Sequence, residues 1–191
     1  MAHKFNPKNK EKLDNPERRR TLPPKDTLYN LMLEEGDYVA DIGCGIGYFT
    51  LAAAEIVGAK GRVFALDTSV EMLDYLKEII EDEGIENIEV IKSEEHNANI
   101  SDESIDFMLI SNVMHEVEDI GEFLENYLNK MKVNSKLAII DWKKVKTKGG
   151  PPYDERISIE DLINILEDYN IELLKKVDLS NEQYALVGKK V

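Results

Sequence analysis

The apolar positions along this chain alternate between two kinds of spacing. Short runs of consecutive apolar residues, typical of buried strands, alternate with segments whose apolar residues recur every three or four positions, as in helices packed by one face. The predicted helices cover residues 24–33, 48–57, 70–83, 120–131 and 158–169, and the predicted strands cover 38–41, 62–66, 88–91, 105–110, 136–141, 171–178 and 184–188. The chain is therefore expected to alternate between strand and helix along most of its length.

This order of elements predicts an α/β fold. Successive strand–helix units favour a parallel sheet with helices on both faces. The last two predicted strands are joined by a short polar connection with no helix, so we expect them to form an antiparallel hairpin. The expected fold is a doubly wound, mostly parallel seven-stranded sheet with an antiparallel C-terminal hairpin. Two helix starts are predicted from capping-box spacing, at Thr68 with Glu71 and at Ser158 with Asp161.

The first 23 residues do not follow this pattern. They are basic, poor in apolar side chains and interrupted by prolines, so we expect an irregular or briefly helical arm over residues 1–23 and one domain over residues 24–191. Two interpretations of the arm remain open. It is either a solvated tail or a lid over an adjacent site, with Arg18, Arg19 and Arg20 offered to an anionic group and Phe5 or Leu13 as an apolar plug.

Composition and charge exclude several classes of protein. A chain of 191 residues accommodates one ordinary domain, and its net charge is −14, of which residues 1–25 contribute +5 and the remainder −19. This acidity opposes general binding to nucleic acid or anionic membranes. The single cysteine, Cys44, and the lack of a signal peptide or a long apolar run predict a cytoplasmic protein with no membrane span.

A glycine-rich loop carries the first chemical signal. It directly follows a predicted strand and reads Gly-x-Gly-x-Gly over residues 43–47, with Asp41 before it, while Asp67 ends the next predicted strand 22 residues after Gly45. Ligands of doubly wound sheets bind at the carboxyl ends of the strands. Asp41 would repel a pyrophosphate but suits an ammonium group, and Asp67 can accept both hydroxyls of a ribose. S-adenosylmethionine, a nucleoside with a cationic amino-acid tail and no phosphate, fits this pattern.

Four segments together resemble a known family. VADIGCGIGYFT, RVFALDTSVEML, IDFMLISNVMHEVED and KLAIIDWKK resemble the successive motifs of the class I S-adenosylmethionine-dependent methyltransferases, over roughly residues 36–142. The predicted C-terminal hairpin agrees with the reversed seventh strand of that family. The chain is most similar to its small stand-alone bacterial and archaeal members, a group that includes the ubiquinone and menaquinone biosynthesis methyltransferases. The resemblance implies methyl transfer from S-adenosylmethionine to an acceptor.

The resemblance also implies roles for individual residues around the methionine portion of the donor. Asp41 would face its amino group, and the backbone of Gly43, Cys44 and Gly45 would surround the rest of the tail. The residues that would lie beside the sulfonium and the acceptor are Ser111 and Asn112.

The nucleoside portion is assigned in the same way. Asp67 would accept the ribose hydroxyls. After the third strand the family usually has an Asp followed by a small residue, whereas residues 93–96 here read Ser-Glu-Glu-His. The adenine contact is therefore left open between Glu94 and Glu95, with Glu94 favoured. The other residues expected beside the adenine are Thr68 and Met72.

Catalysis and acceptor choice are less constrained by sequence. Methyl transfer depends mainly on alignment and exclusion of water, and a base is needed only if the acceptor arrives protonated. His115, after the fourth predicted strand, is the candidate base, and its alternative role is packing. The three histidines are not spaced as metal ligands, so no metal site is expected. The candidate contacts to an aromatic or anionic small-molecule acceptor are Tyr48, Trp142, Tyr153 and Arg156.

Other functional classes remain open at this stage. The basic arm favours an RNA or protein methyltransferase, but the acidic remainder opposes one, and residues 111–114 read Ser-Asn-Val-Met, without the Asn/Asp-Pro-Pro-Tyr/Phe tetrapeptide common in base-methylating members of the family. A noncatalytic S-adenosylmethionine-binding protein is a second alternative. A nicotinamide dehydrogenase is a third, and Asp41 opposes it because a dinucleotide would bring a phosphate to the loop.

Overall fold

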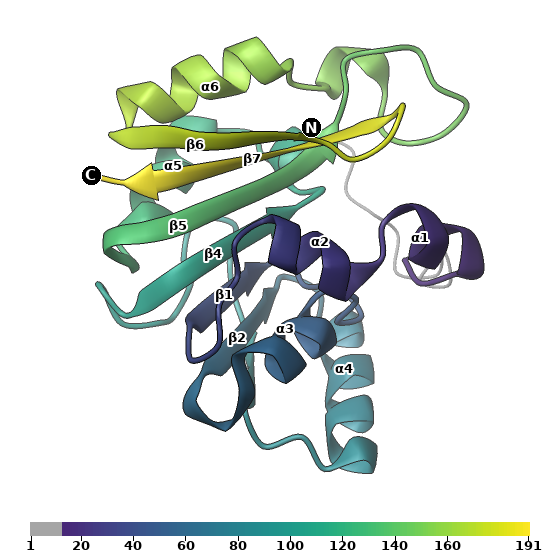
Figure 1. Ribbon diagram of the computed structural model, residues 1–191, viewed down its shortest axis with the longest axis vertical. Coiled ribbons are helices and arrows are strands. Elements are labelled where there is room, and N and C mark those ends of the chain that lie inside the picture. Colours follow the sequence, from purple (N-terminus) through teal and green to yellow (C-terminus); the bar gives the residue numbers. More distant parts are fainter. Residues whose placement is uncertain (1–12) are drawn as a thin grey trace.

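A computed structural model describes residues 13–191 and contains one seven-stranded sheet between two layers of helices (Figure 1). The strands are β1 Tyr38–Ile42, β2 Arg62–Asp67, β3 Ile88–Lys92, β4 Ile105–Ser111, β5 Met131–Trp142, β6 Ile171–Asp178 and β7 Gln183–Lys190. The helices are α1 Pro16–Thr21, α2 Pro24–Asn30, α3 Thr50–Val57, α4 Val70–Glu83, α5 Ile120–Leu128 and α6 Ile159–Asp168, with short 3₁₀ turns η2 Gly58–Lys60, η3 Met114–Glu116 and η4 Tyr153–Glu155. Within the described part of the chain, no helix has the length and apolar character needed to cross a membrane.

The order of strands across the sheet is β3-β2-β1-β4-β5-β7-β6. Strands β1 to β5 pair in parallel, and β7 runs antiparallel to both β5 and β6. This arrangement confirms the predicted fold, including the reversed C-terminal hairpin. Because β1 lies between β2 and β4, the order of strands changes direction there. The carboxyl ends of β1 and β4 therefore border the crevice in which open α/β sheets bind ligands.

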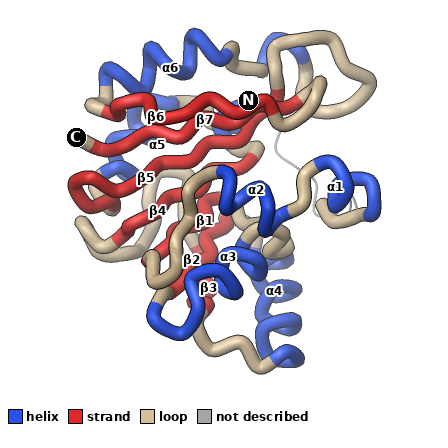
Figure 2. The backbone as a smooth tube through the Cα atoms, viewed as in Figure 1, coloured by secondary structure: helices blue, strands red, loops and turns tan. Residues whose placement is uncertain are grey.

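The central strands are buried on both faces, as expected for a parallel sheet. Alternate residues of β4 and β5 belong to two different core clusters, and helices lie on both sides of the strands (Figure 2). One face, with α5 and α6, includes Met108, Ile110, Leu137 and Ile139. The other, with α2 and α3, includes Phe107, Leu109, Ala138 and Ile140. Helix α4 packs on β2 and β3 through a smaller cluster. The sheet is thus a rigid support for the loops at its carboxyl edge.

Two helix starts differ from the sequence-based expectation. Helix α3 begins at Thr50 and not at residue 48, because residues 43–49 are used in the turns of the glycine loop. Helix α4 is capped by Ser69 and not by Thr68: the Ser69 hydroxyl accepts a hydrogen bond from the backbone N–H of Met72 at 3.4 Å. Both differences lie where the chain leaves a strand and enters the crevice.

Most remaining ends are closer to expectation, although the predicted helix 24–33 ends at Asn30 and the predicted strand 136–141 begins at Met131. The predicted helix 120–131 ends at Leu128, and Met131 begins β5, where it pairs with Ile105. The cap of α6 is confirmed, because the Ser158 hydroxyl accepts from the N–H of Asp161 at 3.1 Å. The described part of the N-terminal arm contains one short helix, α1, which Figure 1 shows beyond the right-hand edge of the sheet.

Candidate functional site

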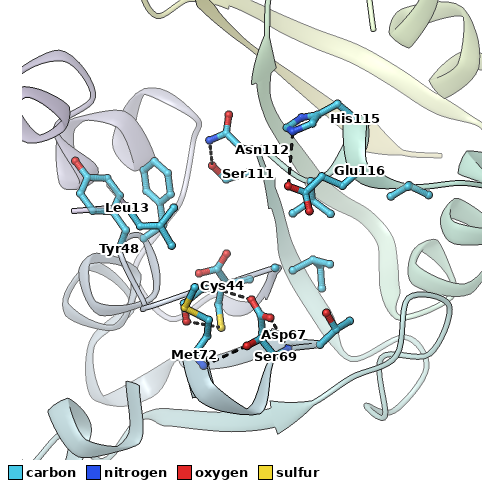
Figure 3. A pocket seen from close by; sticks show the side chains of 18 of the residues that line it. Leu13, Cys44, Tyr48, Asp67, Ser69, Met72, Ser111, Asn112, His115 and Glu116 are labelled. Carbon is cyan, nitrogen blue, oxygen red and sulfur yellow. Dashed lines mark hydrogen bonds and ion pairs between the residues drawn. The ribbon is translucent and has the colours of Figure 1, made fainter. Parts of the chain in front are cut away.

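A cavity of about 710 Å³ lies at the carboxyl edge of the sheet. Its wall is built from the loops that follow β1, β2, β3 and β4, from Trp142 at the end of β5, and from Leu13 and Arg18 of the N-terminal arm. Figure 3 shows Asp67, Ser69 and Met72 at one end, His115 and Glu116 at another, and Leu13 and Tyr48 facing them across the space. This volume lies in the range of small-molecule sites, roughly 300–1,000 Å³.

The glycine loop leaves no room for side chains against its neighbours. Gly43 and Gly47 have φ angles of +70° and +86°, and a Cβ on them would lie 2.3 Å from Val113 Cγ2 and 2.4 Å from Leu76 Cδ1, respectively. The N–H groups of Gly43 and Cys44 both donate to the Leu66 carbonyl, at 2.8 and 2.9 Å. The loop is therefore fixed against β2 and α4 and exposes bare backbone to the cavity.

Asp67 fastens this loop to the start of α4. Its Oδ2 accepts from the N–H of Gly45 and its Oδ1 from the N–H of Ser69, both at 2.8 Å. Burial raises the pKa of Asp67 above its ordinary value, although hydrogen bonds from the backbone N–H groups of Ser69, Gly45 and Thr68 oppose the shift. A carboxylate has about four acceptor positions, so Asp67 retains capacity for a donor in the cavity. Thr68 and Met72 line the cavity beside it.

Asp41 is a buried acid on the cavity wall. It is 2% exposed and accepts a hydrogen bond from Thr50 Oγ1 at 2.6 Å. Burial raises its pKa to about 7, with the Asp67 charge adding to the shift and the Thr50 hydrogen bond opposing it. Among residues 13–191, no Lys, Arg or His forms an ion pair with this carboxylate. A cationic group in the cavity would satisfy it.

The neighbouring Cys44 thiol also belongs to the wall. It is buried, and its burial, together with the charges of Asp41 and Asp67, raises the pKa of the thiol. It therefore stays protonated and contributes a small apolar surface, not a nucleophile.

The loop after β3 places the two glutamates differently. Glu95 lines the cavity, and its Oε1 accepts from the backbone N–H of Glu118 at 3.2 Å. Glu94 is not part of the wall: its backbone pairs with Asn97, and its carbonyl accepts from the Tyr127 hydroxyl at 3.1 Å. The structure therefore brings Glu95, and not the favoured Glu94, to the cavity wall, and the adenine contact itself stays a prediction.

Ser111 and Asn112 occupy the middle of the cavity wall, at the end of β4 (Figure 3). Asn112 has a φ of +57°, and its Oδ1 accepts from Gln183 Nε2 at 2.8 Å. Its amide nitrogen donates to Ser111 Oγ at 3.3 Å. These bonds fix the Asn112 side chain between the end of the cavity that holds Asp67 and the end that holds His115.

His115 forms a pair with a buried acid that the sequence analysis did not single out. Its Nδ1 lies 2.6 Å from Oδ1 of Asp141, which is 1% exposed and also accepts from the N–H of Trp142 at 2.7 Å. Burial lowers the pKa of His115, but the hydrogen bond and charge of Asp141, with the charges of Glu116 and Glu155, outweigh it and leave the pKa raised. With the Nδ1 proton directed at Asp141, the basic nitrogen of neutral His115 is Nε2.

The described part of the arm lies over the glycine loop. A Cβ on Gly45 would come within 3.2 Å of Leu13 Cδ1. The Arg18 guanidinium lies 4.6 Å above the Tyr48 ring, and the Tyr48 hydroxyl donates to the Leu22 carbonyl at 2.7 Å. Of the two apolar residues suggested as a plug, Leu13 is on the cavity wall, and Phe5 lies outside the described residues.

Two of the four candidate acceptor contacts line the cavity and two do not. Tyr48 and Trp142 are wall residues, whereas Tyr153 is not and its side chain is half exposed. Arg156 is 4% exposed, and its guanidinium donates to Thr147 Oγ1 and to the carbonyls of Lys143, Val145, Gly149 and Pro151. Arg156 therefore holds the loop that carries Gly150 and Pro151 to the wall and is not itself a wall residue.

Several wall residues were missed by sequence reasoning. They are Phe49, Ser93, Val113, Glu116, Val117, Phe123 and Tyr127, and Asp141 stands behind His115. Asp141 carried a usable signal, because it is an acid at the end of a predicted buried strand, like Asp41 and Asp67. Phe123 and Tyr127 carried none, since their spacing on α5 is that of core residues. Within the described residues, no group of three or more His, Cys, Asp or Glu could hold a metal ion.

Comparison with known proteins adds the family relationship. The methyltransferase domain family matches residues 33–185. An S-adenosylmethionine-dependent methyltransferase from Aquifex aeolicus, known from a crystal structure, is 35% identical with a TM-score of 0.92, over 98% of this chain and 100% of that one. A demethylmenaquinone methyltransferase from Listeria welshimeri is 28% identical over 129 residues, 63% of this chain and 55% of its own length. This chain thus spans about half the length of the curated relatives it matches.

A more distant structure has the same fold. Geranyl diphosphate C-methyltransferase from Streptomyces coelicolor, crystallised with Mg²⁺, geranyl diphosphate and S-adenosylhomocysteine, has a TM-score of 0.76 at 14% identity, over 92% of this chain and 82% of that one. At this identity the likeness concerns the fold alone.

Proposed function

Because this chain belongs to the methyltransferase domain family and uses S-adenosylmethionine as its methyl donor, we propose that it methylates a small aromatic acceptor bound in the same cavity. One observation carries the proposal: a single cavity joins an acidic half beside the glycine loop to a half that holds His115 and Trp142. The likeness to a demethylmenaquinone methyltransferase over 63% of this chain supports an aromatic, quinone-like acceptor.

The acidic half of the cavity suits the donor. Asp41 is a buried carboxylate that lacks a cation among residues 13–191, which suits the ammonium of an amino-acid tail. Asp67 retains acceptor capacity for the ribose hydroxyls, and we assign Glu95 to the adenine amino group because it lines the cavity. The glycine loop supplies a close backbone surface between them. S-adenosylmethionine supplies an electrophilic methyl group on a sulfonium, so no residue has to activate it.

The half that holds His115 suits an acceptor that is flat and partly apolar. Trp142 contributes a ring and Val117 contributes aliphatic surface, and Tyr48 faces His115 across the cavity (Figure 3). Apolar walls with few polar groups are typical of small-molecule sites. His115 is the group in this half that can accept a proton at Nε2, with its ring held by Asp141. A phenolic hydroxyl that loses its proton to His115 becomes a better nucleophile.

The coverage of the cavity argues against a polymeric acceptor. Leu13 packs against Gly45, and Arg18 lies over the Tyr48 ring in the wall, so residues of the arm cover part of the cavity. The charge of −19 over residues 26–191 also repels nucleic acid. A small molecule can fit in a partly covered cavity and is not repelled in the way that a polyanion is.

The test uses the full chain and methyl-labelled S-adenosylmethionine. The protein is incubated in parallel with a panel of small phenols and hydroquinones, with total RNA and with unfolded protein, and label is followed into each fraction. We expect label only in the small-molecule fraction, and none with Asp67→Asn. Transfer to RNA or protein would contradict the proposed acceptor class.

A binding measurement separates the donor from the acceptor. Isothermal titration is expected to detect S-adenosylmethionine and S-adenosylhomocysteine at micromolar concentrations and no binding of NAD. Binding of NAD alone, by protein freed of copurified ligand, would refute the donor assignment and favour a dehydrogenase.

A further inference from the structure

The charges on the cavity wall are unbalanced. Four carboxylates line the described cavity, contributed by Asp41, Asp67, Glu95 and Glu116. Against these, Arg18 is the only Lys or Arg among the described wall residues. It comes from α1, whereas Asp41 comes from β1.

Arg18 is held at this position by its own helix and by the domain. Its backbone N–H donates to the side chain of Asn15 at 2.9 Å, and its carbonyl accepts from the N–H of buried Leu22 at 2.7 Å. Its guanidinium lies over the ring of Tyr48, whose hydroxyl bonds the Leu22 carbonyl. Stacking on a fixed ring limits the rotamers of the Arg18 side chain, so the group is preorganised.

The guanidinium nevertheless has unused hydrogen-bonding capacity. The Nε atom of Arg18 is buried and has no hydrogen-bond partner. The acid on the same segment, Asp14, is taken by Arg19 through two hydrogen bonds of 2.6 and 2.5 Å. Within residues 13–191, no carboxylate forms an ion pair with Arg18. A buried, unsatisfied donor on a cation is costly unless a ligand satisfies it.

The donor has an anionic group that needs such a partner. The amino-acid tail of S-adenosylmethionine ends in an ammonium and a carboxylate on the same carbon, and the proposed function assigns Asp41 to the ammonium. The adjacent carboxylate would otherwise face an acidic wall, where like charges repel. Leu13, in the turn before α1, reaches the glycine loop at Gly45, so the segment that leads into α1 borders the part of the cavity assigned to the donor tail.

We propose that Arg18 binds the α-carboxylate of S-adenosylmethionine and thereby joins α1 to the bound donor. This inference rests on the proposed donor site. A guanidinium can bind a carboxylate through two parallel hydrogen bonds, one of them from Nε. The cavity then recognises both ends of a zwitterion, with Asp41 on the sheet and Arg18 on the helix above it. S-adenosylhomocysteine carries the same tail and is bound in the same way.

The test compares two donors that differ only in this carboxylate. Isothermal titration measures S-adenosylmethionine and decarboxylated S-adenosylmethionine with the full-length wild type, Arg18→Met and Arg20→Met. Arg20 is exposed on the same helix and is absent from the cavity wall, so it is the matched control. Loss of a charge-assisted contact is expected to weaken S-adenosylmethionine about 10- to 100-fold in Arg18→Met. Decarboxylated S-adenosylmethionine should bind wild type and Arg18→Met equally, and Arg20→Met should match wild type with both ligands.

Each other outcome has a definite meaning. Equal weakening of both ligands in Arg18→Met would overturn the proposal, because Arg18 would then act only by supporting Tyr48. Unchanged binding of both ligands would also overturn it, and a raised KM for a carboxylated acceptor in that variant would reassign Arg18 to the acceptor. Failure of wild type to bind either donor would refute the proposed function itself. Arg18→Lys, which keeps the charge but not the planar fork, should recover only part of the affinity.

Discussion

The unusual property of Asp41 is that folding raises its pKa, from 3.8 to about 7. The folded state therefore holds this proton more tightly than the unfolded state does. The contribution of Asp41 to stability is complete below the unfolded pKa and is lost as the pH rises through about 7. Above pH 7 the ligand-free protein contains a buried negative charge whose natural partner is a cation in the cavity.

Replacing this carboxylate should separate stability from binding. Asp41→Asn is expected to raise the free energy of unfolding of the ligand-free protein at pH 8 by roughly 1–3 kcal/mol, with a smaller gain at pH 5, where Asp41 is already protonated. The same variant should lose most of its affinity for S-adenosylmethionine. Urea unfolding at both pH values and titration calorimetry measure the two effects.

A second substitution controls for the hydrogen bond. Thr50→Val removes the hydroxyl that donates to Asp41 and keeps the charge, so it should destabilise the protein at pH 8. An Asp41→Asn protein that is less stable than wild type at pH 8 would contradict the prediction that the buried charge of Asp41 lowers the free energy of unfolding.

The pairing of His115 with Asp141 predicts a dependence of the rate on pH. If His115 is the base, it acts in its neutral form. Asp141, Glu116 and Glu155 together outweigh burial and raise its pKa, so kcat should fall as the pH falls through a value above the ordinary pKa of histidine. In Asp141→Asn the carboxylate that raises the pKa of His115 is lost, and burial then lowers that pKa. The acidic fall in kcat should therefore move to lower pH. Because the His115 ring is then no longer held in place by Asp141, the maximal kcat at high pH should also fall about 10- to 100-fold.

The measurement is the pH profile of methyl transfer to an acceptor found in the panel. Asp141 bonds the backbone of Trp142 as well as the His115 ring, so thermal unfolding of Asp141→Asn must accompany the kinetics. A profile and plateau unchanged in both Asp141→Asn and His115→Gln would assign His115 to packing alone.

At the scale of elements, the glycine loop depends on close packing as well as on backbone freedom. Gly47→Ala would place a Cβ 2.4 Å from Leu76 at a φ of +86°, whereas Gly84, at the end of α4 with a φ of +63°, has nothing within 4 Å of the same position. Gly84→Ala should therefore cost about 1 kcal/mol from backbone strain alone. Gly47→Ala adds overpacking of about 1–3 kcal/mol. Urea unfolding of the two variants compares them, and equal losses would refute the packing contribution.

The helices and strands were predictable where the apolar periodicity and the helix-terminating residues indicated the same boundary. Helix α4 has the predicted ends because its apolar periodicity stops at Gly84, which takes a left-handed conformation. The pattern misled where burial continued beyond the helix. Tyr48 and Phe49 are buried in turns before α3, and Met131 continues the stripe of α5 but pairs with Ile105 in β5. Apolar periodicity indicates which side chains are buried, whereas pairing with neighbouring strands determines whether the backbone there is helix or strand.

At the scale of the whole molecule, the site was predictable as far as topology determines it. Parallel strands end at one edge, so Asp41 and Asp67 were expected to meet there, and the same rule applied to Asp141 would have found the partner of His115. Arg156 could not be predicted in this way. The loop that it holds has carbonyls that no strand or helix satisfies, and they take up its guanidinium donors. A basic side chain in a loop can bond the carbonyls of that loop or bind a ligand. Which of the two it does depends on tertiary contacts that the spacing of residues in the sequence does not reveal.

The position of α1 makes ligand binding a property of the whole fold. Leu13 and Arg18 contact a cavity whose floor is the loops after β1 and β2, so a donor that touches both should stabilise them together. At a free concentration of S-adenosylhomocysteine 100 times its Kd, the free energy of unfolding should rise by about 2.7 kcal/mol. For a chain of this size the midpoint of thermal unfolding should then increase by about 5–10 °C.

Hydrogen exchange shows where this stabilisation is located. If α1 belongs to the donor site, the amides of residues 16–22 should gain protection together with those of residues 43–48 and 67–72, since all three segments border one ligand. Arg18→Met should retain the protection of the two loops at saturating ligand and lose that of α1, whereas Arg20→Met should behave as wild type. Protection confined to the loops in wild type would mean that the donor binds without α1. In that case the arm would act on the acceptor or on neither ligand.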